Sequence, residues 1–139
     1  MIGPMRKTLL LAVPFATGLV LALTAGAQPP PVLIGKVGFH NEFRISLTFP
    51  NGALVRTLPA GTYTIVVHDY SRIHNFALGS VTENRRIFTG SIRGIGTKSY
   101  TVDLTPGAYA YACSAHFRTM HGAFTVTAAD TTTTGTTTG

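Results

Sequence analysis

The stretch YAYACSAHFRTMHG, residues 109–122, holds the single cysteine of the chain, two of its five histidines and its only methionine after residue 5. Tyr109, Tyr111 and Cys113 alternate with alanines, which is the period-two pattern of a β-strand with its bulky side chains on one face. The alternation stops at Cys113 and resumes after Gly122. We therefore predict a strand, a short loop and a second strand, with Cys113 as the last inward residue before a loop rich in possible metal donors.

The same alternation recurs along the rest of the chain. Stretches rich in β-branched and aromatic residues are found at 32–39, 44–49, 62–67, 74–79, 98–104, 108–113 and 123–128. The turn-forming triplets PNG, PAG and TPG separate several of them. No segment after residue 27 has a convincing helical period. Short strands at this spacing, in about a hundred residues, predict an all-β fold: a Greek-key antiparallel β-sandwich.

The two ends of the chain are not expected to belong to this fold. Residues 1–27 combine two basic residues, a mostly apolar run and AGA before QPPP, which predicts an export signal cleaved after Ala27. An uncleaved membrane anchor over 8–27 is the alternative, because that run is just long enough to span a bilayer. Residues 129–139 are rich in threonine and glycine and predict a flexible tail. One domain over 31–128 remains, and we expect it in the periplasm or outside the cell.

The charge of the chain limits its partners. The formal net charge is +6, and removal of Arg6 and Lys7 with the signal leaves nine basic and five acidic residues, a net charge of +4. The basic residues are spread out, without the aromatic-interleaved basic run that is typical of nucleic-acid binding. We therefore expect no nucleic-acid partner, and a mildly acidic partner surface is the better expectation.

The loop after the strand offers a thiolate, an imidazole and a thioether from Cys113, His116 and Met120. A second imidazole is expected from His74, because the sequence around it changes from a polar turn to an apolar strand and so places it at one end of the sandwich. Two imidazoles, a thiolate and a weak axial thioether are the ligands of trigonal electron-transfer copper. Zinc also accepts cysteine and histidine, but its structural sites rarely use methionine. Copper is therefore the predicted metal.

The segment GAYAYACSAHFRTMHGAFTV at 107–126, together with the upstream HNF, resembles the cupredoxins, the family of plastocyanin and azurin. The likeness covers nearly the whole predicted domain and implies a small blue copper protein with one type 1 copper ion. Carried over by position, it makes His74, Cys113 and His116 the equatorial ligands and Met120 the axial ligand. Three residues separate His116 from Met120, one fewer than in plastocyanin, so the likeness does not extend to a subfamily.

The resemblance also gives a role to Asn75. In the family, the backbone N–H at this position points at the thiolate sulfur, and the side chain is bonded to the residue after the cysteine, here Ser114. Contacts of this kind fix the orientation of metal ligands and tune the metal.

Three of the four candidate ligands have a plainer alternative. Cys113 could be an inert core thiol, and His74 could cap a turn. Met120 could pack without binding strongly while His121 takes the fourth position.

Four further residues are expected outside the metal chemistry. His40 and His68 are not expected to bind metal, and His68 should face solvent because it alternates with apolar neighbours. Tyr109 and Tyr111 are expected to be core and corner residues of the sandwich.

The expected function is that of a one-electron carrier, a monomer that docks transiently with redox partner proteins. The family resemblance implies an exit for electrons at His116, through an apolar patch near Ala115 and Phe117. A copper carrier in copper homeostasis is the alternative, but a mature chain with one methionine disfavours it. No enzyme is expected, because hydrolytic triads, paired carboxylates and phosphate-binding loops are not evident. No stable membrane insertion is expected if the signal is cleaved.

Overall fold

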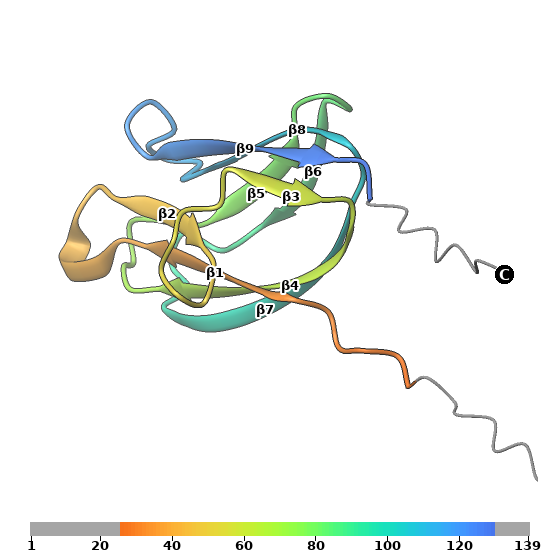
Figure 1. Ribbon diagram of the computed structural model, residues 1–139. Coiled ribbons are helices and arrows are strands. Elements are labelled where there is room, and N and C mark those ends of the chain that lie inside the picture. The colour runs from red at the N-terminus through yellow and green to blue at the C-terminus, as the bar shows by residue number, and fades with distance from the viewer. Residues whose placement is uncertain (1–25, 130–139) are drawn as a thin grey trace, which may run out of the picture.

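The computed structural model describes residues 26–129 of the chain. This part consists of nine strands and one short 3₁₀ turn (Figure 1). Their bounds are β1 (Val32–Val37), η1 (Phe39–Asn41), β2 (Ile45–Thr48), β3 (Thr57–Pro59), β4 (Gly61–Asp69), β5 (Ala77–Ser80), β6 (Arg85–Thr89), β7 (Gly96–Leu104), β8 (Gly107–Ala112) and β9 (His121–Thr127). The described residues contain no α-helix, so the predicted all-β sandwich is confirmed.

The strands form two facing sheets, in the orders β2-β1-β4-β7 and β3-β9-β8-β5-β6. Both sheets are mixed, because β1 runs parallel to β4 and β3 runs parallel to β9. The predicted antiparallel pairing is found in five of the seven strand pairs, and these two pairs are the exceptions. The chain leaves the first sheet after β2, forms β3 at the edge of the second, and returns as β4 beside β1. This crossing between sheets brings strands of the same direction together.

One strand starts later than predicted and two strands were not predicted, for physical reasons. The strand expected at 74–79 starts only at Ala77, because the preceding residues form a loop. β6 was not predicted, since its sequence RRIFT lacks clean alternation. It is an edge strand that is exposed or half-buried along its whole length. β3 was also missed, because it is only three residues long and ends in proline, which a sheet accepts at an edge.

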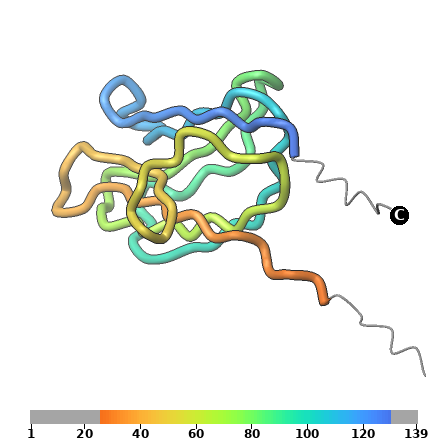
Figure 2. The backbone as a smooth tube through the Cα atoms, in the orientation of Figure 1, coloured from red at the N-terminus to blue at the C-terminus, as the bar shows by residue number. Residues whose placement is uncertain are grey.

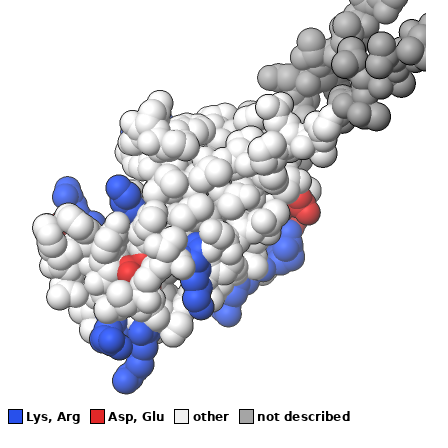
Figure 3. All heavy atoms as spheres, turned by 90° about the horizontal axis from the view of Figure 1, so that it is seen from below, with Lys and Arg blue, Asp and Glu red and all other residues white. Residues whose placement is uncertain are grey.

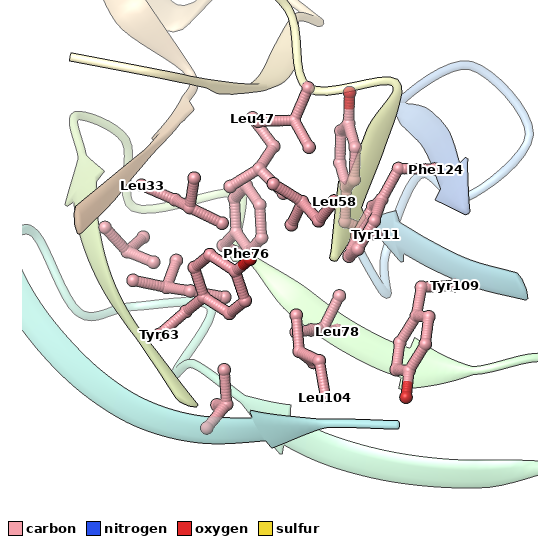
Figure 4. Close-up of a cluster of buried hydrophobic side chains, with 14 of the residues drawn as sticks. Leu33, Leu47, Leu58, Tyr63, Phe76, Leu78, Leu104, Tyr109, Tyr111 and Phe124 are labelled. Carbon is pink, nitrogen blue, oxygen red and sulfur yellow. The ribbon is translucent and has the colours of Figure 1, made fainter. Parts of the chain in front are cut away.

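The core lies between the two sheets and is built by the inward residues of the alternating strands (Figure 4). Tyr109, Tyr111 and Cys113 are all buried, as their shared parity predicts. The Tyr109 hydroxyl donates to the carbonyl of Thr105 at 2.9 Å and accepts from the Thr105 N–H at 3.0 Å. Tyr109 is therefore a corner residue that ties β8 to the turn before it, as the sequence predicts.

Four loops meet at one end of the sandwich, and we call this end the loop end. It consists of residues 38–44, 70–76, 90–95 and 113–120. Strand pairing places their anchor points together, because Asp69 pairs with both Val37 and Gly96, and Ala77 pairs with both Thr89 and Ala112. The first and last described residues lie at the opposite end (Figure 2).

The predicted terminal segments remain predictions. The export signal, apart from Gly26 and Ala27, lies outside the described residues, and so does the tail from residue 130 onward. Within residues 26–129, no helix has the length and apolar character needed to cross a membrane.

Gly122, the second residue of β9, lies where a side chain would not fit. It pairs with Tyr111 across β8 and β9, and a Cβ atom at this position would overlap the Tyr111 ring. We expect Gly122→Ala to lower the free energy of unfolding by about 1–3 kcal/mol, the usual cost of overpacking. Urea unfolding measures the change, and Ala123→Ser at the exposed next position is the control. Equal stability of the two variants would contradict this packing.

Candidate metal centre

The loop after β8 is closed by its own backbone. The N–H of Cys113 donates to the carbonyl of Met120 at 2.9 Å, and the N–H of Met120 donates to the carbonyl of His116 at 2.9 Å. The N–H of His116 in turn donates to the carbonyl of Cys113 at 3.2 Å. These bonds fold the loop tightly, so that three potential donors close in sequence are also held close in space.

His74 reaches the same end of the sandwich from the loop before β5. It is fully buried, and it packs against Gly38 at the start of the 38–44 loop. A Cβ atom at Gly38 would lie 2.5 Å from Ser71 Cβ and 2.9 Å from His74 Cδ2, and the φ of Gly38 is +67°. Both the left-handed backbone and the close approach therefore require glycine here. Gly38 lets the loop press directly on the imidazole.

Three donor atoms converge on one point. His74 Nδ1 lies 3.1 Å from His116 Nδ1, and Cys113 Sγ lies 3.8 Å and 3.7 Å from these two nitrogens. A point in the plane of the three atoms is about 2.1 Å from each of them, within the roughly 2.0–2.3 Å of imidazole and thiolate bonds to a first-row metal ion. Two imidazole nitrogens facing each other at this distance cannot both carry a proton. The donor set therefore fits a bound metal ion.

The fourth candidate, Met120, is fully buried next to these residues in the loop. The alternative fourth ligand, His121, is exposed, and its Nδ1 lies 2.9 Å from the carbonyl oxygen of Phe117. Because a carbonyl can only accept, Nδ1 of His121 carries a proton and donates to it. His121 therefore fastens the loop from outside, whereas Met120 is placed on the inside.

The other histidines lie away from this cluster. The exposed ring of His40 lies against Phe39 at a tilt of 32°, with a centroid separation of 3.9 Å. His68 lies on the outer face of β4, where its Nδ1 is 2.9 Å from the hydroxyl of Thr97. Among the residues that the structure describes, only His74, Cys113 and His116 form a group of three or more potential histidine, cysteine or carboxylate ligands.

Asn75 connects the two ligand loops. Its side-chain oxygen accepts from the N–H of Ser114 at 2.8 Å and from the Ser114 hydroxyl at 3.0 Å, and its amide donates to the carbonyl of Gly90 at 2.9 Å. The predicted link to Ser114 is thus present. The expected bond from the Asn75 N–H to the cysteine sulfur is not found among the described residues, where the sulfur's polar contacts are with Nδ1 of His74 and Nδ1 of His116. Asn75 fixes the first turn after Cys113 and ties it to the 90–95 loop.

Electrostatics prepare His74 for binding a cation. Burial lowers the pKa of His74 below its ordinary value of 6.5, repulsion from His116 lowers it further, and the backbone of Asn41 acts in the opposite direction. His74 is therefore neutral at pH 7. Its Nδ1 is the atom aimed at the cluster, because it lies 3.1 Å from Nδ1 of His116 and 3.8 Å from Sγ of Cys113.

One residue at the site was missed by the sequence analysis. Phe43 places its ring edge-on against both imidazoles, with centroid separations of 4.9 Å to His74 and 4.8 Å to His116. The ring is 54% exposed, so it forms part of the outer cover of the cluster. No spacing rule links position 43 to the ligands, and an aromatic residue in a polar loop was the only signal in the sequence.

The fold and this donor set together define the class: a β-sandwich with a cysteine and two histidines converging at its loop end. No protein-family model matches the chain, and no curated protein matches its sequence. Solved structures do match. Rusticyanin from Thiobacillus ferrooxidans is similar with a TM-score of 0.54 and 14% identity, over 69% of this chain and 76% of that chain.

Auracyanin A, a "blue" copper protein from the green thermophilic photosynthetic bacterium Chloroflexus aurantiacus, is similar with a TM-score of 0.52 and 20% identity. The match covers 71% of this chain and 100% of that chain. Both neighbours have the cupredoxin fold, and this chain has it too. The likeness establishes the architecture, whereas the metal is indicated by the donor atoms of His74, Cys113 and His116.

Proposed function

We propose that the chain is an exported type 1 copper protein that carries single electrons between redox partners. Copper would be held by Nδ1 of His74, Nδ1 of His116 and Sγ of Cys113, with Met120 as the weak axial ligand. The observation that carries the proposal is the triangle of donor atoms, 3.1, 3.7 and 3.8 Å on its sides. Soft sulfur donors combined with imidazoles favour copper over zinc.

Bound copper would supply a Cu(I)/Cu(II) couple, and the residues of the chain would decide how it works. The backbone bonds of the 113–120 loop and the contacts of Asn75 restrain the donor atoms, so that they move little between oxidation states. Cys113 is fully buried, which shields the thiolate from water and oxidants. His116 is only partly buried and lies nearest to solvent, which supports its role as the route for electrons.

Two other features support this function over its alternatives. A copper carrier must release its ion, whereas here the thiolate and His74 are both buried and built into the core. An enzyme would need a place for substrate at the metal, and the ring of Phe43 instead covers both imidazoles of the cluster. We therefore propose transient docking to partner proteins and no catalytic activity. Export rests on the predicted signal at 1–27, with the periplasm or the extracellular space as the location.

Addition of Cu(II) to the purified domain tests the proposal. We expect an intense blue absorption band, because it requires charge transfer from a thiolate to Cu(II). Two further measurements, stopped-flow electron exchange and transfer of copper to a chelator, distinguish an electron carrier from a copper carrier. An electron carrier exchanges electrons quickly and keeps its metal. A colourless complex, or rapid loss of copper with slow electron exchange, would refute the proposal.

A further inference from the structure

The ring of Phe43 lies between the candidate metal centre and the solvent. It contacts both imidazoles edge-on, with centroid separations of 4.9 Å to His74 and 4.8 Å to His116, and the two imidazoles are themselves 4.8 Å apart. The three rings thus form a compact triangle. Because His74 and Cys113 are fully buried whereas Phe43 is 54% exposed, the Phe43 ring is the outer member of this triangle.

The loop that carries Phe43 is closed by backbone hydrogen bonds. The N–H of Gly38 donates to the carbonyl of Arg44 at 3.1 Å, and the N–H of Glu42 donates to the carbonyl of Phe39 at 3.0 Å. Both chain neighbours of Phe43 are therefore tied to other residues of the same loop. With its backbone fixed in this way, the ring can leave the imidazoles mainly by rotation of its own side chain.

A groove of about 520 Å³ lies on the other side of the Phe43 ring. The described residues that line it include Phe43 together with Thr119 and His121, but neither of the two candidate ligand histidines. The groove therefore reaches the outer face of the Phe43 ring, and this ring separates it from the donor atoms. A small molecule in the groove is one aromatic ring away from the metal centre.

The charge of the groove does not keep small anions away. Its lining includes two basic side chains, Lys36 and Arg44, and one acidic side chain, Glu42. Glu42 lies 3.6 Å from Arg44, whereas Lys36 forms no ion pair with a carboxylate within residues 26–129. On the face shown in Figure 3, basic side chains are spread over the surface and acidic side chains are sparse. Small anions are therefore attracted to the groove.

We propose that Phe43 controls access to the copper site: its ring keeps water and small anions in the groove away from the donor atoms, and its rotation admits them. This role presupposes the proposed function and assigns the exposed side of that site to one residue. An apolar cover controls which solvent molecules and ligands reach a metal ion. An extra ligand that binds Cu(II) more tightly than Cu(I) would have to leave at each electron transfer, so its exclusion keeps the transfer fast.

Phe39 provides a matched control for this role. It belongs to the same loop, lines the same groove and is 51% exposed, close to the value for Phe43. Its ring lies against His40 and Tyr70, and the described residues show no aromatic contact between it and either ligand imidazole. Replacement of Phe39 by alanine therefore removes a similar ring from the groove and leaves the cover over the imidazoles in place.

Labelling of the copper-free protein tests access directly. Cys113 is the only cysteine, so its alkylation by iodoacetamide reports how often the donor atoms are reached. We expect Phe43→Ala to speed alkylation on the order of tenfold under native conditions, and Phe39→Ala and Phe43→Tyr to leave the rate nearly unchanged. Urea unfolding of the same variants measures their stability. Equal rates in the two alanine variants, or an increase that the lost stability fully explains, would overturn the proposal.

Addition of azide to the copper-loaded variants tests the same cover with a small anion. We expect azide to change the visible and electron paramagnetic resonance spectra of Phe43→Ala, and to leave those of the parent, Phe39→Ala and Phe43→Tyr unchanged. No response of Phe43→Ala, or an equal response of the parent protein, would overturn the proposal. Because alkylation needs no copper, a protein that shows the expected labelling pattern but never turns blue would refute only the proposed function.

Discussion

Replacement of Cys113 by serine is expected to abolish the blue absorption of the copper-loaded protein while leaving the sandwich folded. Cys113 supplies the only sulfur in the three-atom cluster, and the band depends on a thiolate. Serine is close to cysteine in size, so the buried position remains filled. The fold itself is set by the alternating strands and their apolar core, which do not need the metal.

Visible and far-ultraviolet spectroscopy of the same samples separate the two effects. Loss of the band with an unchanged β-sheet spectrum is the expected result. His40→Gln is the matched control, because His40 is exposed and lies outside the cluster, and it should keep the band. A blue Cys113→Ser variant would refute the assignment of the copper site, since no other thiol exists in the chain.

The fold was predictable from the sequence wherever one face of a strand is buried and the other is not. β4 and β8 alternate cleanly and were predicted nearly to their ends. β6 was not, because an edge strand with both faces partly exposed leaves no alternation to detect. The parallel pairs β1/β4 and β3/β9 were also not predicted. Strand pairing depends on how the chain crosses between the sheets, and the residues of a single strand do not reveal it.

The candidate site was predictable for a different reason. Three of its four residues lie within eight consecutive positions, so a tight loop was enough to bring Cys113, His116 and Met120 together. His74 could be added because its loop precedes an apolar strand. The strand pattern predicts these residues at one end of the sandwich, and the structure brings the cysteine and both histidines within contact distance there.

The contact of Phe43 with the two imidazoles could not be predicted from the sequence. Its ring lies on the imidazoles because the backbone before it turns in an unusual way: Gly38, His40 and Asn41 all have positive φ values. Such left-handed residues cost energy unless their surroundings fix them, and they gather at functional sites. The contact that results is between residues 31 and 73 positions apart and depends on a turn that no periodicity predicts.

Met120 and His121 are the two candidates for the axial ligand, and substitutions at these positions should have different effects on the reduction potential. A thioether is a soft and weak donor that favours Cu(I), whereas the amide oxygen of glutamine is harder and favours Cu(II). Met120→Gln should therefore lower the reduction potential, by on the order of 100 mV, since each tenfold change in relative affinity for the two oxidation states corresponds to about 59 mV.

His121→Gln is the matched control for this change, at the next position in the chain. The ring of His121 is exposed and donates to the carbonyl of Phe117 from outside the loop, and a glutamine amide can donate in the same way. The potential of this variant should stay nearly unchanged. Voltammetry and visible spectra of both variants decide between the two residues. If His121→Gln shifts the potential and Met120→Gln does not, His121 is the axial ligand, and the loop must rearrange from the conformation described above when the metal binds.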